Sequence, residues 1–353
     1  MVQTNFPKLD AREAHFRIPS HHAELSLFLR YLPPFRETEP PGNVVLYVHG
    51  GTFPSALSIA HRFDGRSWRD ELAAIGFHCW GLDFHGFGRL SDPYPEMAEP
   101  AEKHAQLGRA EDASRQLEQA VRFICAHHRV NRISLIAHSW GSIVSGRFAG
   151  RCPELVERMV FFGPIAWRSR RTDPQRLPAW RLVSLKDQWE RFVADVPPGE
   201  PPVLSKRHFE EWGDAYLDTD PESRTRSPPA VKTPSGAFQD IYDAWAGELA
   251  YDPALVRAPV AIIRGEWDGM STEEDAVWLF HALKSAIRRI VIISRGTHLM
   301  HLEESRYALY RETEAFLAGK DAVATPHAPS RLKQEDAHVC CDFRSPTEEG
   351  TME

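Results

Sequence analysis

The chain alternates between short apolar stretches and longer stretches in which apolar residues recur with a helical period. Residues 13–32 predict two strands joined by a polar turn at 19–22. Apolar, often β-branched stretches then predict strands buried on both faces, at residues 44–48, 77–84, 133–137, 159–163, 260–264 and 289–294. Helical patterns lie between them, at residues 68–75, 109–128, 272–284 and 300–317. This alternation predicts an α/β fold with a mostly parallel sheet and helices on both of its faces.

Residues 166–249 interrupt this alternation. The segment contains five of the chain's ten tryptophans and several Pro-Pro pairs, and its clearest periodic stretches are helical. We therefore predict a helical cap, or lid, inserted into a core of residues 1–165 and 250–318, because strand-rich sequence resumes after it. An independent second domain is the alternative. Residues 319–353 have too few apolar residues to bury and predict a disordered tail.

Composition and charge exclude several kinds of partner. The 353 residues carry a formal net charge of −7, which offers no electrostatic case for binding nucleic acid or an anionic membrane. No stretch is long and apolar enough to span a bilayer, and the first residues lack the pattern of a signal peptide. The five cysteines are an odd number without metal-ligand spacing. We expect a cytoplasmic protein with no metal and no organic cofactor, and we leave its oligomeric state open.

Ser139 lies in the string ISLIAHSWGSIVSGRF, where an apolar strand passes through a tight turn into a helix-compatible stretch. A serine on such a turn has its hydroxyl lifted clear of the sheet, and neighbouring backbone N–H groups point toward whatever its oxygen attacks. This is the geometry that acyl transfer requires. Gly141 is the small residue expected two positions later, whereas Ala137 stands where a G-x-S-x-G pattern has its first glycine.

Two polar residues follow later strands in the order that suits a serine nucleophile. Asp268 follows one predicted strand in the string GEWDG, and His298 follows the next in GTHLMHLE. Because the carboxyl ends of parallel strands share one edge of a sheet, we expect His298 to act as the base on Ser139 and Asp268 to orient it. The simpler interpretations are a turn aspartate and one of seventeen histidines, with His301 as the nearest rival.

The small-x-Ser-x-Gly turn, followed by the aspartate and the histidine, resembles the α/β-hydrolases over roughly residues 13–318. The resemblance implies the α/β-hydrolase fold, with a mostly parallel sheet flanked by helices and an inserted helical cap. It also implies an oxyanion hole. One N–H donor maps onto Gly51 in VLYVHGGTFPS, with Thr52 as second choice, and the other is the N–H of Trp140. The string DFHGFGRLSD is similar to a stretch that follows the fourth strand in this family.

These residues predict a serine hydrolase that cleaves an acyl bond of a small molecule, most simply an ester or thioester of a partly apolar metabolite. A proline iminopeptidase-like amidase is one alternative, because SWGS is similar to those enzymes although HGGTF departs from their H-G-G-P-G. A lyase, a cyclase or a ligand receptor with the same pocket is another. A basic run could bind a carboxylate or a phosphate, or form a solvated surface: Arg168, Arg170, Arg171, Arg176 and Arg181.

Overall fold

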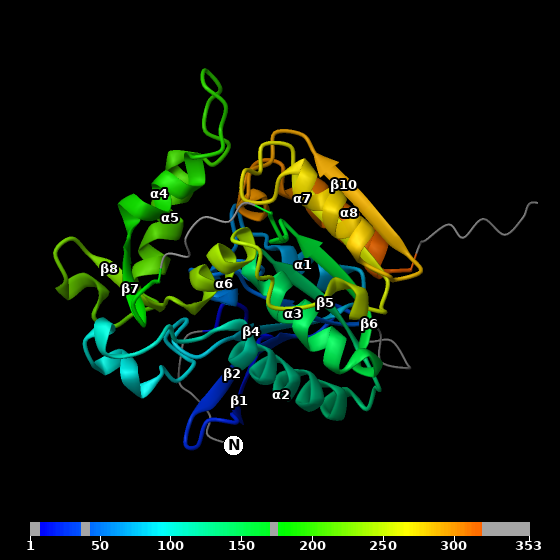
Figure 1. The fold of residues 1–353 in the computed structure, drawn as a ribbon, viewed down its shortest axis with the longest axis horizontal. Coiled ribbons are helices and arrows are strands. Elements are labelled where there is room, and N and C mark those ends of the chain that lie inside the picture. Colours follow the sequence, from blue (N-terminus) through cyan, green and yellow to red (C-terminus); the bar gives the residue numbers. More distant parts are fainter. Residues whose placement is uncertain (1–7, 37–42, 170–175, 320–353) are drawn as a thin grey trace, which may run out of the picture. The chain divides into compact units, whose positions relative to one another are not determined.

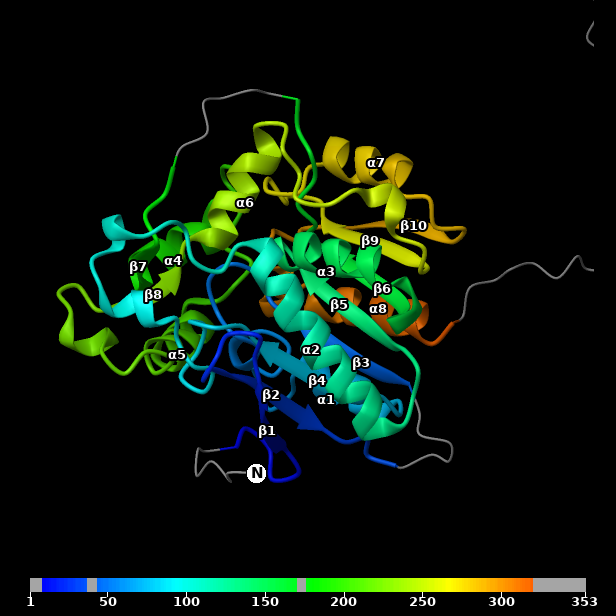
Figure 2. The ribbon, with the colours of Figure 1, turned by 60° about the horizontal axis from the view of Figure 1, so that its bottom comes forward.

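The computed structural model describes residues 8–36, 43–169 and 176–319, so the predicted tail lies outside them apart from Gly319. Within these residues the main sheet has eight strands in the order β1-β2-β4-β3-β5-β6-β9-β10 (Figures 1 and 2). The strands are β1 (Ala14–Pro19), β2 (Ser26–Leu32), β3 (Val44–Val48), β4 (His78–Asp83), β5 (Ile133–His138), β6 (Val156–Phe162), β9 (Val260–Gly265) and β10 (Arg288–Ile293). The β1–β2 and β2–β4 pairs are antiparallel, and the other pairs are parallel. This topology confirms the predicted α/β fold with a mostly parallel sheet.

The central strands are apolar along nearly their whole length because both of their faces are covered. Every residue of β3 and β5 is buried. Successive side chains point to opposite faces, so Leu46 and Leu135 belong to one hydrophobic cluster while Tyr47 and Ile136 belong to the other. The sheet therefore separates two layers of apolar packing.

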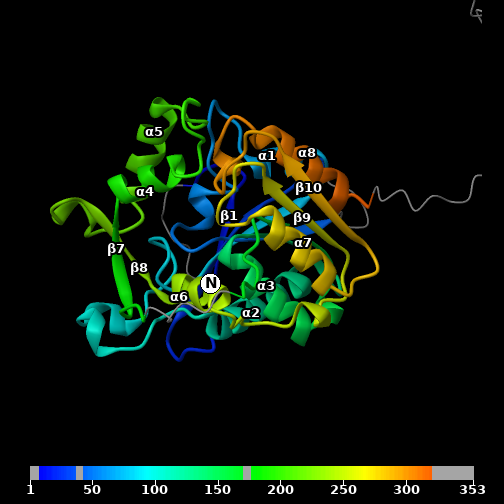
Figure 3. The ribbon, with the colours of Figure 1, turned by 45° about the horizontal axis from the view of Figure 1, so that its top comes forward.

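Helices cover both faces of the sheet (Figures 2 and 3). On one face lie α2 (Ala110–His128), α3 (Trp140–Arg151) and α7 (Glu273–Ala282), and on the other lie α1 (Trp68–Ala74) and α8 (Arg306–Leu317). Capping boxes at Ser67 and Thr272 begin α1 and α7. Short 3₁₀ segments lie at Ser55–Leu57, Pro95–Ala98, Ala101–Lys103, Pro153–Leu155, Ser223–Thr225, Pro253–Leu255 and Met300–Leu302. Among the described residues, none of the helices has the length and apolar character needed to cross a membrane.

The segment between β6 and β9 is an insertion between two neighbouring strands of the sheet. Its described part contains α4 (Leu185–Val193), α5 (Lys206–Leu217) and α6 (Gly236–Trp245), with a two-stranded antiparallel sheet of β7 (Trp180–Ser184) and β8 (Ala230–Pro234) (Figure 1). The prediction of a helical cap did not include this small sheet, because WRLVS and AVKTP are short and carry charged residues or proline. Phe192 and Trp212 of the insertion share a hydrophobic cluster with Phe53 and Leu299 from loops of the core.

Candidate active site

Ser139 occupies the turn between β5 and α3. Its backbone has φ 55° and ψ −125°, a strained combination for a residue with a side chain and one that a nucleophile elbow requires. Gly141 lets α3 approach the sheet closely, because a Cβ atom there would lie 2.6 Å from the carbonyl oxygen of Val48. Ala137 is fully buried in β5, so the core accommodates its methyl group where the common pattern has glycine.

Three side chains from separate loops form a continuous hydrogen-bonded chain. The Oγ atom of Ser139 lies 2.8 Å from Nε2 of His298, and Nδ1 of His298 lies 3.0 Å from Oδ1 of Asp268. Because a carboxylate only accepts hydrogen bonds, Nδ1 carries the imidazole proton and Nε2 is left to accept the serine proton. All three residues are at most 4% exposed. The structure thus brings together the three residues that we selected from the sequence as nucleophile, base and acid.

The loop after β9 holds Asp268 in place. Its Oδ1 atom accepts the backbone N–H groups of Met270 and Ser271, at 3.0 and 2.9 Å. The buried guanidinium of Arg264 donates to the carbonyl oxygens of Ser271, at 2.6 Å, and Asp268, at 3.1 Å. The carboxylate is therefore oriented toward His298 by the backbone of its own loop.

His301 lies in the 3₁₀ segment Met300–Leu302 and is fully buried. Neither of its ring nitrogens has a hydrogen-bond partner among the described residues. Burial, with a smaller contribution from the nearby His298, lowers the pKa of His301 to about 3. His301 is therefore a neutral packing residue, and the structure joins His298 to Ser139 instead.

The predicted oxyanion donors, Gly51 and Trp140, lie in the loop after β3 and at the first position of α3. Within the described residues neither backbone N–H donates to another backbone group, as expected for a loop and for the start of a helix. A Cβ atom on Gly51 would lie 3.3 Å from the ring of Phe238, so this loop packs closely against α6. Both N–H groups therefore lack a backbone acceptor within the part of the chain that the structure describes.

Two further residues shape the site, and the sequence analysis selected neither. Gly163, with φ +52°, follows β6, and a Cβ atom there would lie 3.0 Å from Oδ2 of Asp268 and 3.1 Å from Nδ1 of His298. Asp240 of α6 is buried and accepts the indole N–H of Trp140 at 2.8 Å. Burial raises the pKa of Asp240, and the paired charge of Arg109 and the hydrogen bonds that Asp240 accepts oppose that shift. Gly163 could have been selected from the sequence, because a glycine at the end of a predicted strand is a visible signal. No local pattern marks Asp240 in the same way.

The structure divides the basic run of the sequence analysis. Arg168 pairs with Asp275, with Nη2 and Oδ2 2.6 Å apart, and Arg176 is exposed. Arg181 lines a cavity beside α4 and α6. The two remaining arginines lie outside the described residues: Arg170 and Arg171. The three described arginines of the run therefore lie in three different environments.

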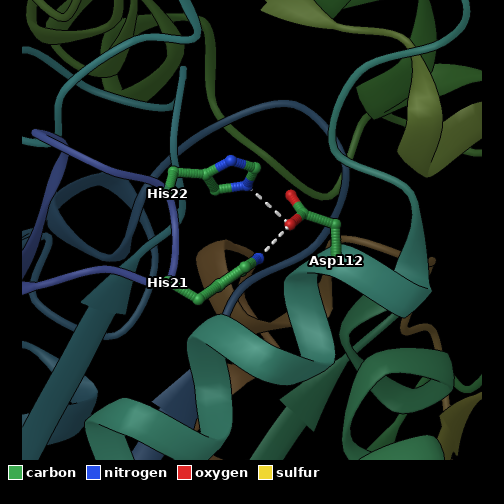
Figure 4. A group of neighbouring side chains, drawn as sticks. All are labelled: His21, His22 and Asp112. Carbon is green, nitrogen blue, oxygen red and sulfur yellow. Dashed lines mark hydrogen bonds and ion pairs between the residues drawn. The ribbon is translucent and has the colours of Figure 1, made fainter.

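One group among the described residues has the composition of a metal site: His21, His22 and Asp112 (Figure 4). The Nε2 atoms of the two histidines lie 2.6 and 2.7 Å from the same oxygen, Oδ1 of Asp112, while Oδ2 accepts the side-chain N–H of Gln116 at 2.9 Å. Two tetrahedral zinc ligands would stand about 3.4 Å apart. The distances fit hydrogen bonds, so we interpret this group as a network that fastens the β1–β2 turn to the first turn of α2.

Fold and site together define a serine hydrolase of the α/β-hydrolase type. The chain belongs to the family described as serine aminopeptidase, S33, whose profile matches residues 39–305. No curated protein matches the chain.

Solved structures with the same fold include a serine hydrolase from Cycloclasticus zankles, with 14% identity, coverage of 88% of this chain and 99% of the other, and a TM-score of 0.56. A 2-hydroxy-6-oxo-6-phenylhexa-2,4-dienoate hydrolase from a Rhodococcus species has 18% identity, coverages of 86% and 98%, and a TM-score of 0.57. A monoacylglycerol lipase from Paleococcus ferrophilus has 18% identity, coverages of 83% and 98%, and a TM-score of 0.52. At these identities the similarity establishes the fold and leaves the substrate open.

Proposed function

We propose that this protein hydrolyses a carboxylic ester or thioester of a small, partly apolar molecule through an acyl-enzyme on Ser139. The observation that supports this most directly is the hydrogen-bonded chain in which 2.8 Å separates Ser139 Oγ from His298 Nε2 and 3.0 Å separates His298 Nδ1 from Asp268 Oδ1. Burial of all three side chains supports it further, because electrostatic interactions are strongest where water is excluded.

The steps follow from the atoms that face one another. His298 Nε2 takes the proton of Ser139 as the serine oxygen attacks the acyl carbon, and Asp268 stabilises the resulting imidazolium. His298 then gives that proton to the leaving alcohol or thiol, so that an ester forms on Ser139. A water molecule, deprotonated by the same Nε2 atom, then attacks this ester; the bond from the acyl carbon to Ser139 Oγ breaks, His298 returns the proton to Oγ, and the acid is released.

The negative charge on the acyl oxygen requires donors that are free before the reaction. The N–H groups of Gly51 and Trp140 meet this requirement, and the loss of one such donor typically costs about 3–4 kcal/mol of transition-state stabilisation. The ring of Phe238 packs against Gly51 and supplies apolar surface beside the donor loop. This arrangement favours an acyl group that is at least partly apolar.

The experiment compares the wild type with Ser139→Ala, using a fluorophosphonate probe and p-nitrophenyl esters of short and medium chain length. We expect labelling and hydrolysis in the wild type and neither in the variant. Ser145→Ala is the matched control, because the buried hydroxyl of Ser145 on the same helix has no hydrogen-bond partner among the described residues. A wild type that neither reacts with the probe nor hydrolyses any ester would contradict the proposal.

The family description gives a second substrate class to test, since it names an aminopeptidase. An aminoacyl p-nitroanilide, such as that of L-proline, measures this activity through the absorbance of the p-nitroaniline that it releases. Faster turnover of the anilide than of every ester would favour the amidase. Product formation that survives in Ser139→Ala would instead favour a lyase, a cyclase or a receptor that uses the same pocket.

A further inference from the structure

Two arginines face one cavity of about 460 Å³ between elements of the insertion. Arg181 comes from β7 and Arg191 from α4, and the ring of Phe238 from α6 forms another wall. Both arginines are partly buried. The guanidinium carbon of Arg181 lies over the ring of Phe238, 3.7 Å from its centre, so the cation contacts the face of an aromatic side chain.

No carboxylate forms an ion pair with either arginine among the described residues. Arg191 donates to two neutral oxygens, Oγ1 of Thr52 at 2.6 Å and Oε1 of Gln188 at 3.0 Å. The Nε atom of Arg181 is buried and has no hydrogen-bond partner there. Burial and the like charge of Arg181 together lower the pKa of Arg191 to about 10. Guanidinium groups stay positively charged at neutral pH, and the carboxylates of Asp187 and Asp195 act on Arg181 and Arg191 only from beyond ion-pair distance.

The two acidic residues at the rim of the cavity have other roles. Asp187 forms the capping box of α4 and accepts the N–H and the hydroxyl of Ser184, both at 2.8 Å. Glu190 is exposed and lies 3.8 Å from Lys186 on the same helix. Partly buried charges are costly unless an opposite charge meets them, so the two guanidinium groups are poised for an anion from outside the chain.

The cavity adjoins the proposed catalytic site through two contacts. Arg191 is bonded to Thr52, which directly follows the proposed oxyanion donor Gly51. The ring of Phe238 contacts the cavity arginine Arg181 and also packs against Gly51. An anion held between the arginines would therefore lie next to the loop that is proposed to bind the reacting acyl oxygen.

We propose that Arg181 and Arg191 bind a carboxylate group of the substrate, so that the protein prefers acyl esters or thioesters that end in a carboxylate. Planar guanidinium groups match carboxylate oxygens, and such charge-assisted hydrogen bonds are strong when partly shielded from water. This inference rests on the proposed function, since it names the substrate class of the same site.

The test compares two p-nitrophenyl esters of equal chain length, mono-p-nitrophenyl adipate and p-nitrophenyl hexanoate. They differ only in a terminal carboxylate or methyl group. We expect the wild type to have a kcat/KM for the adipate ester at least about tenfold higher, mainly through a lower KM, because a charged hydrogen bond contributes about that factor or more. Equal or faster hydrolysis of the hexanoate would overturn the carboxylate site while leaving the proposed hydrolase intact.

A variant pair locates the effect. Arg181→Met keeps an unbranched apolar side chain against Phe238 but removes the charge, and it should lower the adipate-to-hexanoate ratio of kcat/KM by about 10- to 100-fold. Arg176→Met, at an exposed arginine nearby in sequence, should leave the ratio unchanged. An unchanged ratio in Arg181→Met would contradict the assignment. If neither ester is hydrolysed and Ser139 resists the fluorophosphonate, the proposed function and this inference fail together.

Discussion

Gly163→Ala tests whether the close approach at the end of β6 holds the three proposed catalytic residues in register. The glycine has φ +52°, in the left-handed region that side chains disfavour. An added Cβ atom would lie 3.0 Å from Oδ2 of Asp268 and 3.1 Å from Nδ1 of His298, closer than such contacts normally are. The methyl group therefore displaces the imidazole, the carboxylate or the backbone that carries the alanine.

The two consequences have different sizes. A left-handed alanine destabilises the fold by about 1–2 kcal/mol relative to glycine, which lowers the melting temperature by a few degrees in a chain of this size. A displacement of a few tenths of an ångström lengthens the 2.8 Å contact between His298 and Ser139. Because misplacing a reacting group by about 1 Å costs about 100-fold in rate, we expect kcat to fall by about 10- to 100-fold.

The assay measures kcat and KM with a p-nitrophenyl ester and the melting temperature by circular dichroism. Gly65→Ala is the control, since Gly65 has φ +82° and a Cβ atom there would meet nothing within 4 Å. Both variants should lose similar stability, whereas only Gly163→Ala should lose activity. If Gly163→Ala is as active as Gly65→Ala, the reasoning about the close contact is refuted.

Three other substitutions test the neighbouring residues. Asp268→Asn should reduce kcat by about 10³- to 10⁴-fold with little change in melting temperature, because an amide in place of the carboxylate favours the wrong imidazole tautomer. Asp240→Ala should lower kcat more than it raises KM, because the indole of Trp140 loses its acceptor and the backbone N–H of Trp140 shifts. Asp240→Asn retains an acceptor and should restore most of the rate. Burial raises the pKa of Glu303 to about 7 although the hydrogen bonds from Thr297 oppose the shift, so the folded protein binds this proton more tightly than the unfolded chain does. Its stabilising contribution is therefore complete below about pH 4.5 and is lost as the pH rises through 7. In urea unfolding, the wild type should lose about 3 kcal/mol of unfolding free energy between pH 5 and pH 8, and Glu303→Gln should not show this loss.

Each of these expectations has a result that would count against it. Full activity in Asp268→Asn would show that the carboxylate does not set the imidazole tautomer. Equal rates for Asp240→Ala and the wild type would mean that the indole contact does not position the backbone donor. A free energy of unfolding with the same pH dependence in Glu303→Gln and the wild type would exclude Glu303 as the titrating group.

The sequence by itself determined the parts of this protein that depend on neighbours along the chain. Strands buried on both faces are continuous apolar stretches, so β3, β5 and β9 were visible in the order of residues alone. The turn at Ser139 was visible because only small residues allow a strand to pass so sharply into a helix. The β7–β8 sheet was not visible, because its strands are only five residues long and their pairing joins residues about 50 positions apart.

Only the tertiary structure decided how distant residues meet. His298 and His301 are three positions apart and both buried, yet only the ring of His298 meets Ser139, across 159 positions of sequence. Arg191 was equally hidden, because an arginine on an amphipathic helix usually faces solvent and nothing local shows that this one faces a cavity. The physical reason is the same in both cases. Local sterics and hydrophobic periodicity select the elements, whereas the angle and distance at which those elements pack select the atoms that touch.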